Sequence, residues 1–279
     1  MAIPTEEVIK RIQDLPSLSA VVVELMQTME QEDVDVGALA GKIALDQSLA
    51  AKTLRLANSS FYGMPSKVTT IQQAISVLGF HSIRTLVTAC AVTGCFASGP
   101  GAEFDFDAFW RHAIATAACA RVLAKSLKLN PETAFTAGLL HDLGTMVLVT
   151  RFPSDYRAVE AHRKQHDCST SLAQQAVFGL DHAMIGSALA AYWKFPQAIQ
   201  QAVAQHHQAP QGGPPTLALA VYLGNVLAHA LDLSGQEDDQ VPELDWAAWR
   251  MLDLDHAATL ALFAEAEQLF RDLSKILVN

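Results

Sequence analysis

Apolar residues recur at steps of three and four along most of this chain, and turn residues separate the segments. The first such face consists of Leu18, Val22, Leu25, Met26 and Met29. This spacing is typical of an amphipathic helix. Similar faces predict further helices over residues 36–44, 46–57, 71–78 and 83–95. The first hundred residues are therefore expected to form a bundle of about five short helices joined by turns.

The clearest break in the pattern is Ala97-Ser-Gly-Pro-Gly-Ala102, which we interpret as a linker. Beyond it, apolar periodicity and cap residues predict helices over residues 108–127, 131–141, 154–165, 169–178, 182–193, 196–207, 217–231 and 256–276. Asp107 is the expected cap of the first, and Gly144 the expected stop signal after His141. The predicted fold class is all-α.

Three parts are expected: an N-terminal helical subdomain over residues 1–100, a second helical subdomain over 101–232, and an acidic loop with a C-terminal helix over 233–279. That last helix carries Leu260, Phe263, Leu269, Phe270 and Leu273 at near-helical spacing. Its apolar face could cover the domain or pair with a second copy in a homodimer, and the pattern leaves both open.

Composition restricts the class of partner. Half of the 279 residues are hydrophobic (51%), so a sizeable core can be buried, and the formal net charge is −10 without a basic run. Nonspecific nucleic-acid binding needs clustered Lys and Arg, so it is not expected, although a local pocket for a small anion stays open. The four cysteines lack zinc-type spacing and predict reduced thiols in a cytosolic protein. We expect no signal peptide, no membrane-crossing run and a cytoplasmic location.

Candidate chemistry gathers at the ends of the predicted helices of the second part. The residues are His112, His141, Asp142, His182, His206 and His207. Imidazole and carboxylate groups are suitable ligands for a divalent metal ion, the expected cofactor if there is one. Adjacent histidines on a helix point about 100° apart, so His206 and His207 could reach two metal ions, or one metal and one phosphate group. The alternative is that these are core histidines and capped helix ends.

A second candidate cluster lies in the first part. Arg55, Asn58, Phe61 and Tyr62 surround a polar turn that ends at Gly63, and polar and aromatic side chains on a turn could bind a ligand or partner. The alternative is structural: Arg55 pairs with a neighbouring acid, and Asn58 caps its helix.

The ordered series His112, His141-Asp142, His182, His206-His207 and Asn225 resembles the HD superfamily of metal-dependent phosphohydrolases. The surrounding stretches resemble more narrowly the HDOD domain, or HD-related output domain, over roughly residues 8–232. These stretches are Leu15-Pro16-Ser17-Leu18, Asp46 to Gly63, Ile71 to Gly79, Phe109 to His112 and Ala191 to Pro196. The resemblance implies an all-helical fold, with the 101–232 part HD-like, and a role in bacterial signal transduction.

The same resemblance weakens the expectation of catalysis. HD enzymes complete their ligand set with an aspartate, where this chain has Asn225. The related HD-GYP phosphodiesterases have a lysine where this chain has Thr145, and a Gly-Tyr-Pro loop where Gln-Ala-Pro follows His207. We therefore expect a regulatory module without catalytic activity that binds a signalling partner protein or a small nucleotide-like ligand. If the protein is an enzyme, His141 and Asp142 would serve a phosphohydrolase with a reduced ligand set; a third possibility is a structural scaffold.

Overall fold

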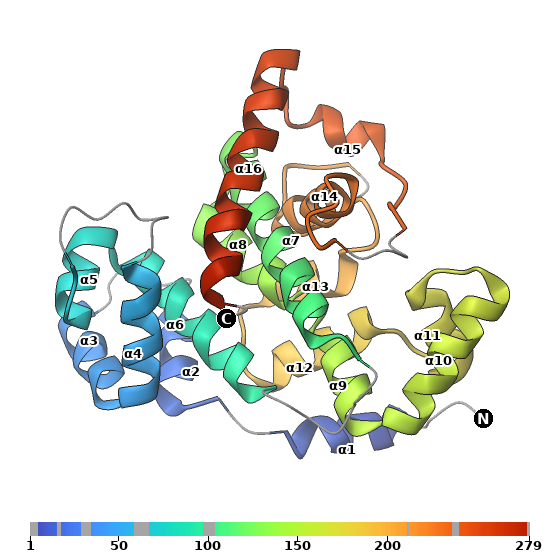
Figure 1. Ribbon diagram of the computed structural model, residues 1–279, viewed down its shortest axis with the longest axis horizontal. Coiled ribbons are helices and arrows are strands. Elements are labelled where there is room, and N and C mark those ends of the chain that lie inside the picture. The colour runs from blue at the N-terminus through green and yellow to red at the C-terminus, as the bar shows by residue number, and fades with distance from the viewer. Residues whose placement is uncertain are drawn as a thin grey trace.

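The computed structural model describes residues 5–15, 18–28, 35–58, 67–96, 104–210, 212–235 and 240–277. Within these residues the chain forms sixteen helices and no strand, so the predicted all-α fold class is confirmed (Figure 1). The predicted linker over residues 97–102 lies outside the described residues.

The helices of the first part are short, and local cap residues set several of their ends. Their bounds are α1 (Thr5–Gln13), α2 (Ala20–Gln27), α3 (Val36–Leu45), α4 (Gln47–Ala57), α5 (Ile71–Leu78) and α6 (Phe80–Cys95). The Asp35 carboxylate caps α3, and the Thr70 hydroxyl caps α5. Helix α6 begins at Phe80 rather than at the predicted Ile83, because Gly79, at φ 82°, turns the chain directly from α5 into α6.

Helix α1 does not join the other N-terminal helices. It packs against α9 and α12, far along the chain, and hydrogen bonds fix its end there. Arg151 donates to the carbonyl oxygen of Asp14 at 3.3 Å, and the Tyr192 hydroxyl donates to that of Gln13 at 3.3 Å. Helix α1 therefore lies against the second half of the chain, and the bundle of α2 to α6 follows it (Figure 1).

The second part surrounds a long central helix. Its helices are α7 (Phe106–Ser126), α8 (Pro131–Leu140), α9 (Leu143–Arg151), α10 (Pro153–His166), α11 (Thr170–Phe178), α12 (His182–Tyr192), α13 (Gln197–Gln205), α14 (Leu217–Ala230), α15 (Trp246–Arg250) and α16 (His256–Leu277). Helices α8, α14 and α16 pack along α7, and α16 also contacts α4. Helix α16 therefore covers the core; pairing with a second copy stays a prediction.

Two predictions about helix ends were wrong. Asp105, not Asp107, caps α7, because its carboxylate accepts the backbone N–H of Ala108 at 2.8 Å. Gly144 does not stop a helix: α8 ends at Leu140, and Gly144 lies in the first turn of α9. A glycine is needed there for packing, since a Cβ would come within 1.9 Å of the His182 carbonyl oxygen and 2.7 Å of Gly186 N. The close contact brings α9 against α12.

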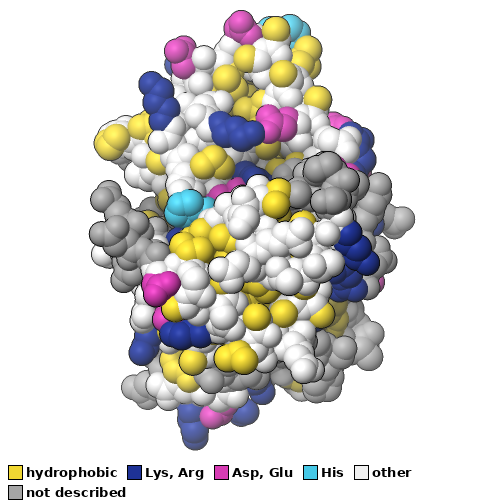
Figure 2. All heavy atoms as spheres, turned by 90° about the vertical axis from the view of Figure 1, so that its left-hand side faces the viewer, with side chains coloured by type: hydrophobic (Ala, Val, Ile, Leu, Met, Phe, Trp, Pro, Cys, Tyr) yellow, Lys and Arg dark blue, Asp and Glu magenta, His cyan; other side chains and the backbone are white. Residues whose placement is uncertain are grey.

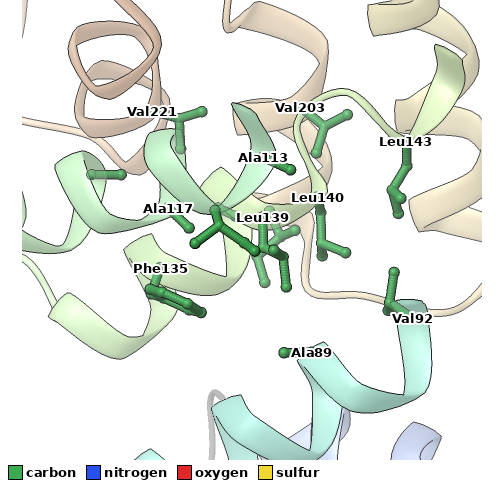
Figure 3. Packing of buried hydrophobic residues seen from close by; sticks show 14 of the residues in the cluster. Ala89, Val92, Ala113, Ala117, Phe135, Leu139, Leu140, Leu143, Val203 and Val221 are labelled. Carbon is green, nitrogen blue, oxygen red and sulfur yellow. The ribbon is translucent and has the colours of Figure 1, made fainter. Parts of the chain in front are cut away.

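The stretch Pro131–Arg151, which comprises α8 and α9, is long and apolar enough to cross a membrane by length and composition. The prediction that no stretch would reach this threshold was therefore wrong. In the folded chain 83% of its apolar window is buried. These residues form the core of the second part, where Leu139 and Leu140 pack between α7 and α6 (Figure 3).

Helix α8 also joins the N-terminal bundle to the second part through its contact with α6. Its neighbour α6 contributes Ala89 and Val92 to the shared core (Figure 3). The same helix carries Arg84, which is only 1% exposed. Arg84 donates to the carbonyl oxygen of Thr28 at 2.9 Å, and burial lowers its pKa against the opposing charge of Glu132 at the start of α8. A displacement of the bundle would therefore act directly on α8.

The N-terminal face shows no concentration of positive charge. Figure 2 shows Lys and Arg scattered over this side, with acidic and apolar side chains between them. The absence of nonspecific nucleic-acid binding stays a prediction.

Candidate metal centre

The six predicted metal ligands come together where the ends of four helices converge. They lie in the first turns of α7 (His112), after α8 (His141 and Asp142), at the start of α12 (His182) and after α13 (His206 and His207). Asp142 lies at the centre. Its Oδ1 is 3.1 Å from His182 Nε2 and 3.3 Å from His206 Nε2, and its Oδ2 is 3.4 Å from His141 Nε2 and 3.6 Å from His112 Nε2.

The ligand atoms form two groups, and Asp142, a member of the first, also contacts the second through Oδ1. One group consists of His112, His141 and Asp142; the other consists of His182, His206 and His207. The Nε2 atom of His182 lies 3.2 Å from that of His206 and 2.7 Å from that of His207. The adjacent histidines therefore point to the same group, rather than to the two separate ligands that the sequence left open.

Three of the rings are held in one orientation by oxygen acceptors behind them. The Nδ1 atoms of His141 and His206 lie 2.6 and 2.7 Å from the carbonyl oxygens of Gly138 and Val203. The Nδ1 atom of His182 lies 2.6 Å from Oε1 of Gln174. These oxygens can only accept, so each Nδ1 carries a proton and each Nε2 points toward the cluster. Outer-shell acceptors of this kind are usual behind metal-binding histidines.

The ionisation of the cluster also suits a cation. Burial lowers the pKa of His141 well below its ordinary value, against the opposing charge of Asp142. Burial would raise the pKa of the Asp142 carboxyl, but the imidazoles of His141 and His182 outweigh it and hold this pKa well below the usual range. The centre thus presents one carboxylate surrounded by imidazoles, a donor set that suits a divalent cation.

Asn225 lies on α14, in the wall of the same cavity, and is 3% exposed. Its Oδ1 has no hydrogen-bond partner among the described residues. A buried carbonyl oxygen without a donor is costly, and coordination of a metal ion would satisfy it. The donor set, the fixed rings and this oxygen together fit a divalent metal ion, although the amide offers no charge where HD enzymes have a carboxylate.

Sequence reasoning missed two residues of the site. Gln174 fixes His182 by accepting from its backbone N–H at 2.8 Å and by contacting its ring. No sequence signal marks this glutamine, because α11 is otherwise an ordinary polar helix. His229 lies on α14, and its ring centroid is 4.5 Å from that of His112. Its position four residues after Asn225, on the same helix face, could have indicated it.

Of the second predicted cluster, the structure describes Arg55 and Asn58, and neither lines the cavity of this centre. Asn58 bridges two backbone segments: its Nδ2 donates to the carbonyl oxygens of Leu54 and Val68, and its Oδ1 accepts the N–H of Val68, all at 2.7 Å. Arg55 is exposed, and Phe61 and Tyr62 lie outside the described residues. The contacts of Asn58 agree with the structural alternative, so its role as a binding residue stays a prediction.

We expect Asn58→Ala to lower the free energy of unfolding by about 2–3 kcal/mol, because two backbone carbonyl oxygens and one N–H lose their partner. Arg55→Ala is the matched control, and its effect should stay within about 0.5 kcal/mol, as for most surface positions. Chemical denaturation of both variants measures the difference. Equal stability of the two variants would contradict the structural role.

Comparisons with known proteins identify the family. The HDOD domain profile matches residues 15–209. An uncharacterised protein of Treponema pallidum (strain Nichols) is 25% identical over 202 residues, which are 72% of this chain and 39% of that protein. This chain thus spans about two fifths of the length of the curated relative it matches.

Solved structures agree on the fold. A protein of Shewanella amazonensis SB2B, provisionally named a phosphohydrolase, is 27% identical, with 97% of each chain covered and a TM-score of 0.73. A provisionally named signal transduction protein of Marinobacter aquaeolei VT8 is 22% identical, covering 99% of this chain and 65% of that chain, with a TM-score of 0.79. With its family profile matched over more than half its length and its helices arranged as in these structures, the chain belongs to the HDOD domain family.

Proposed function

We propose that this chain is a regulatory HDOD module of bacterial signal transduction, without catalytic activity, that holds a divalent metal in its histidine–aspartate centre and binds a small nucleotide-like ligand or a partner protein. The observation that carries the proposal is Asn225: a buried oxygen without a donor in the wall of the metal cavity. This oxygen favours a bound cation. Because the amide carries no charge, it holds the cation less strongly than an aspartate would and makes the site less suited to catalysis.

His112, His141 and Asp142 would hold one metal position, and His182, His206 and His207 a second beside the same carboxylate. A divalent metal there supplies Lewis acidity toward an anionic oxygen of a ligand. The chain's own residues orient the site, since Gly138, Gln174 and Val203 fix the three rings. Helix α8, which ends at this centre and packs on α6, offers a direct path between site and N-terminal bundle.

The second candidate function is a metal-dependent phosphohydrolase with a reduced ligand set. All five histidines of the centre and Asp142 are in place, and the Shewanella relative carries that provisional name. Against this candidate stand Asn225 and Thr145, which replace charged residues of the HD and HD-GYP enzymes that this chain resembles.

Elemental analysis of untagged protein, purified without chelator, tests the proposal. We expect near-stoichiometric divalent metal in the wild type, loss of most of it in His141→Ala, and full retention in His256→Ala, the control for loss of an exposed histidine. Hydrolysis of p-nitrophenyl phosphate and of cyclic dinucleotides with manganese should stay at background. Metal absent from the wild type would refute the metal centre, and turnover that disappears in His141→Ala would establish the phosphohydrolase instead.

A further inference from the structure

The metal centre forms the floor of a cavity of about 1410 Å³ that extends well beyond the ligands. Small-molecule sites usually occupy about 300–1,000 Å³, so there is room for a sizeable ligand. One wall is helix α10, which forms with α11 an antiparallel pair at the side of the molecule (Figure 1). The opposite rim is the segment Gln240 to Pro242, which follows α14.

All Lys and Arg side chains of α10 line this cavity: Arg157, Arg163 and Lys164. This concentration is unusual in a chain with 29 acidic and 19 basic residues. Arg163 lies 3.5 Å from Glu160, and Arg157 donates to the Ser154 hydroxyl at 3.4 Å. In the part of the chain that the structure describes, no carboxylate lies within ion-pair distance of Arg157 or Lys164.

The acidic residues of the cavity do not neutralise this wall. Asp105 accepts the backbone N–H of Ala108 as a helix cap, and Asp142 is enclosed by the histidines. Glu160 is paired with Arg163. The N-terminal residues of α11, Ser169 to Ser171, lie in the same cavity, and the positive end of a helix dipole favours an anion. Arg157 and Lys164 thus face a cavity whose own acidic side chains are engaged elsewhere, whereas the N-terminus of α11 has the Asp181 carboxylate beside it, to which Ser171 donates at 3.1 Å.

Between the basic wall and the metal centre the cavity is aromatic. Phe104 lies edge-on to Tyr156, with ring centroids 5.8 Å apart, and also contacts Phe109 at 6.0 Å. Tyr156 also lines the cavity, and burial and the charges of Glu160 and Asp142 raise its pKa, while Arg163 opposes them. Leu172 and Val241, 57% and 59% exposed, add apolar surface at the rim.

We propose that this cavity binds a phosphorylated aromatic small molecule of the nucleoside phosphate class, with a phosphate group on Arg157 and Lys164 and the ring against Phe104. The proposal rests on the proposed function in that it names the ligand of the same module. The contacts that α10 would make with the phosphate group do not, however, need the metal. Arg157 and Lys164 supply the charge-assisted hydrogen bonds, and the aromatic wall distinguishes a nucleotide from inorganic phosphate.

Calorimetric titration with the four nucleoside 5′-monophosphates, the matching nucleosides and inorganic phosphate tests this. We expect at least one monophosphate to bind the wild type at least about tenfold more tightly than its nucleoside. The double variant Arg157→Gln/Lys164→Gln should lose that difference, whereas Lys10→Gln/Arg271→Gln, which removes the same charge from exposed sites away from the cavity, should keep it. Phe104→Leu should weaken the binding of the nucleotide more than the binding of inorganic phosphate.

Each titration is made with chelator-treated and with manganese-supplemented protein, and thermal unfolding verifies that every variant is folded. Nucleotide binding that depends on Arg157 and Lys164 in chelator-treated protein supports the proposed binding site, even where elemental analysis finds no metal. Metal in the wild type without binding of any monophosphate, or with equal binding by wild type and double variant, overturns the inference and leaves the metal centre standing.

Discussion

Asp142→Asn is expected to reduce the bound metal to less than about a tenth of the wild-type content, with loss from both groups of ligands. One carboxylate serves both, since Oδ1 faces His182 and His206 while Oδ2 faces His141 and His112. An asparagine keeps one oxygen and replaces the other by an NH₂ group, which donates hydrogen bonds to imidazole lone pairs instead of binding a cation.

The same change should lower the stability of the metal-free protein, because the folded chain holds the pKa of Asp142 well below its usual range and therefore favours the charged carboxylate. In Asp142→Asn the Nε2 atoms of His182 and His206 lose a charged partner that lies 3.1 and 3.3 Å away in the wild type. Elemental analysis and chemical denaturation with chelator measure the two effects. Asp253→Asn, at an exposed turn far from the centre, is the control. Full metal content in Asp142→Asn would show that the carboxylate is not a ligand.

Gly144→Ala should lower the free energy of unfolding by about 3 kcal/mol or more, at the upper end of what overpacking costs. The added Cβ would lie 1.9 Å from the His182 carbonyl oxygen and 2.7 Å from Gly186 N, both backbone atoms that no side-chain rotation can move away. To accept it, α9 and α12 must separate. These helices carry Asp142 and His182 at their first turns, so the metal should be lost as well.

Gly41→Ala is the matched control for this prediction. Gly41 is also helical, but a Cβ there would meet no atom within 4 Å. Helix propensity therefore acts alone and should raise stability by about 0.5–1 kcal/mol. Opposite signs for the two substitutions in urea denaturation would establish the close contact of α9 with α12. A stabilising Gly144→Ala would contradict it.

Local chemistry explains why much of the fold could be predicted. Helix positions follow from apolar spacing, and caps such as Asn130, Ser169 and Thr216 act on N–H groups two or three residues away. The same reasoning failed where a distant element decides. Gly144 has the composition of a stop signal, yet α12 makes it an interior packing residue. Asp107 is as good a cap by type as Asp105, and only the course of the chain from Phe104 selects between them.

The sequence by itself determined the helical fold class, the family and the residue types of the centre, because periodicity and motif spacing are properties of neighbours along the chain. The tertiary structure alone decided the direction of each side chain. It made His206 and His207 share one group, placed Gln174 behind His182, left the Asn225 oxygen without a donor, and turned the cations of α10 into the cavity. These arrangements depend on angles and close contacts between helices distant in sequence, which no local pattern encodes.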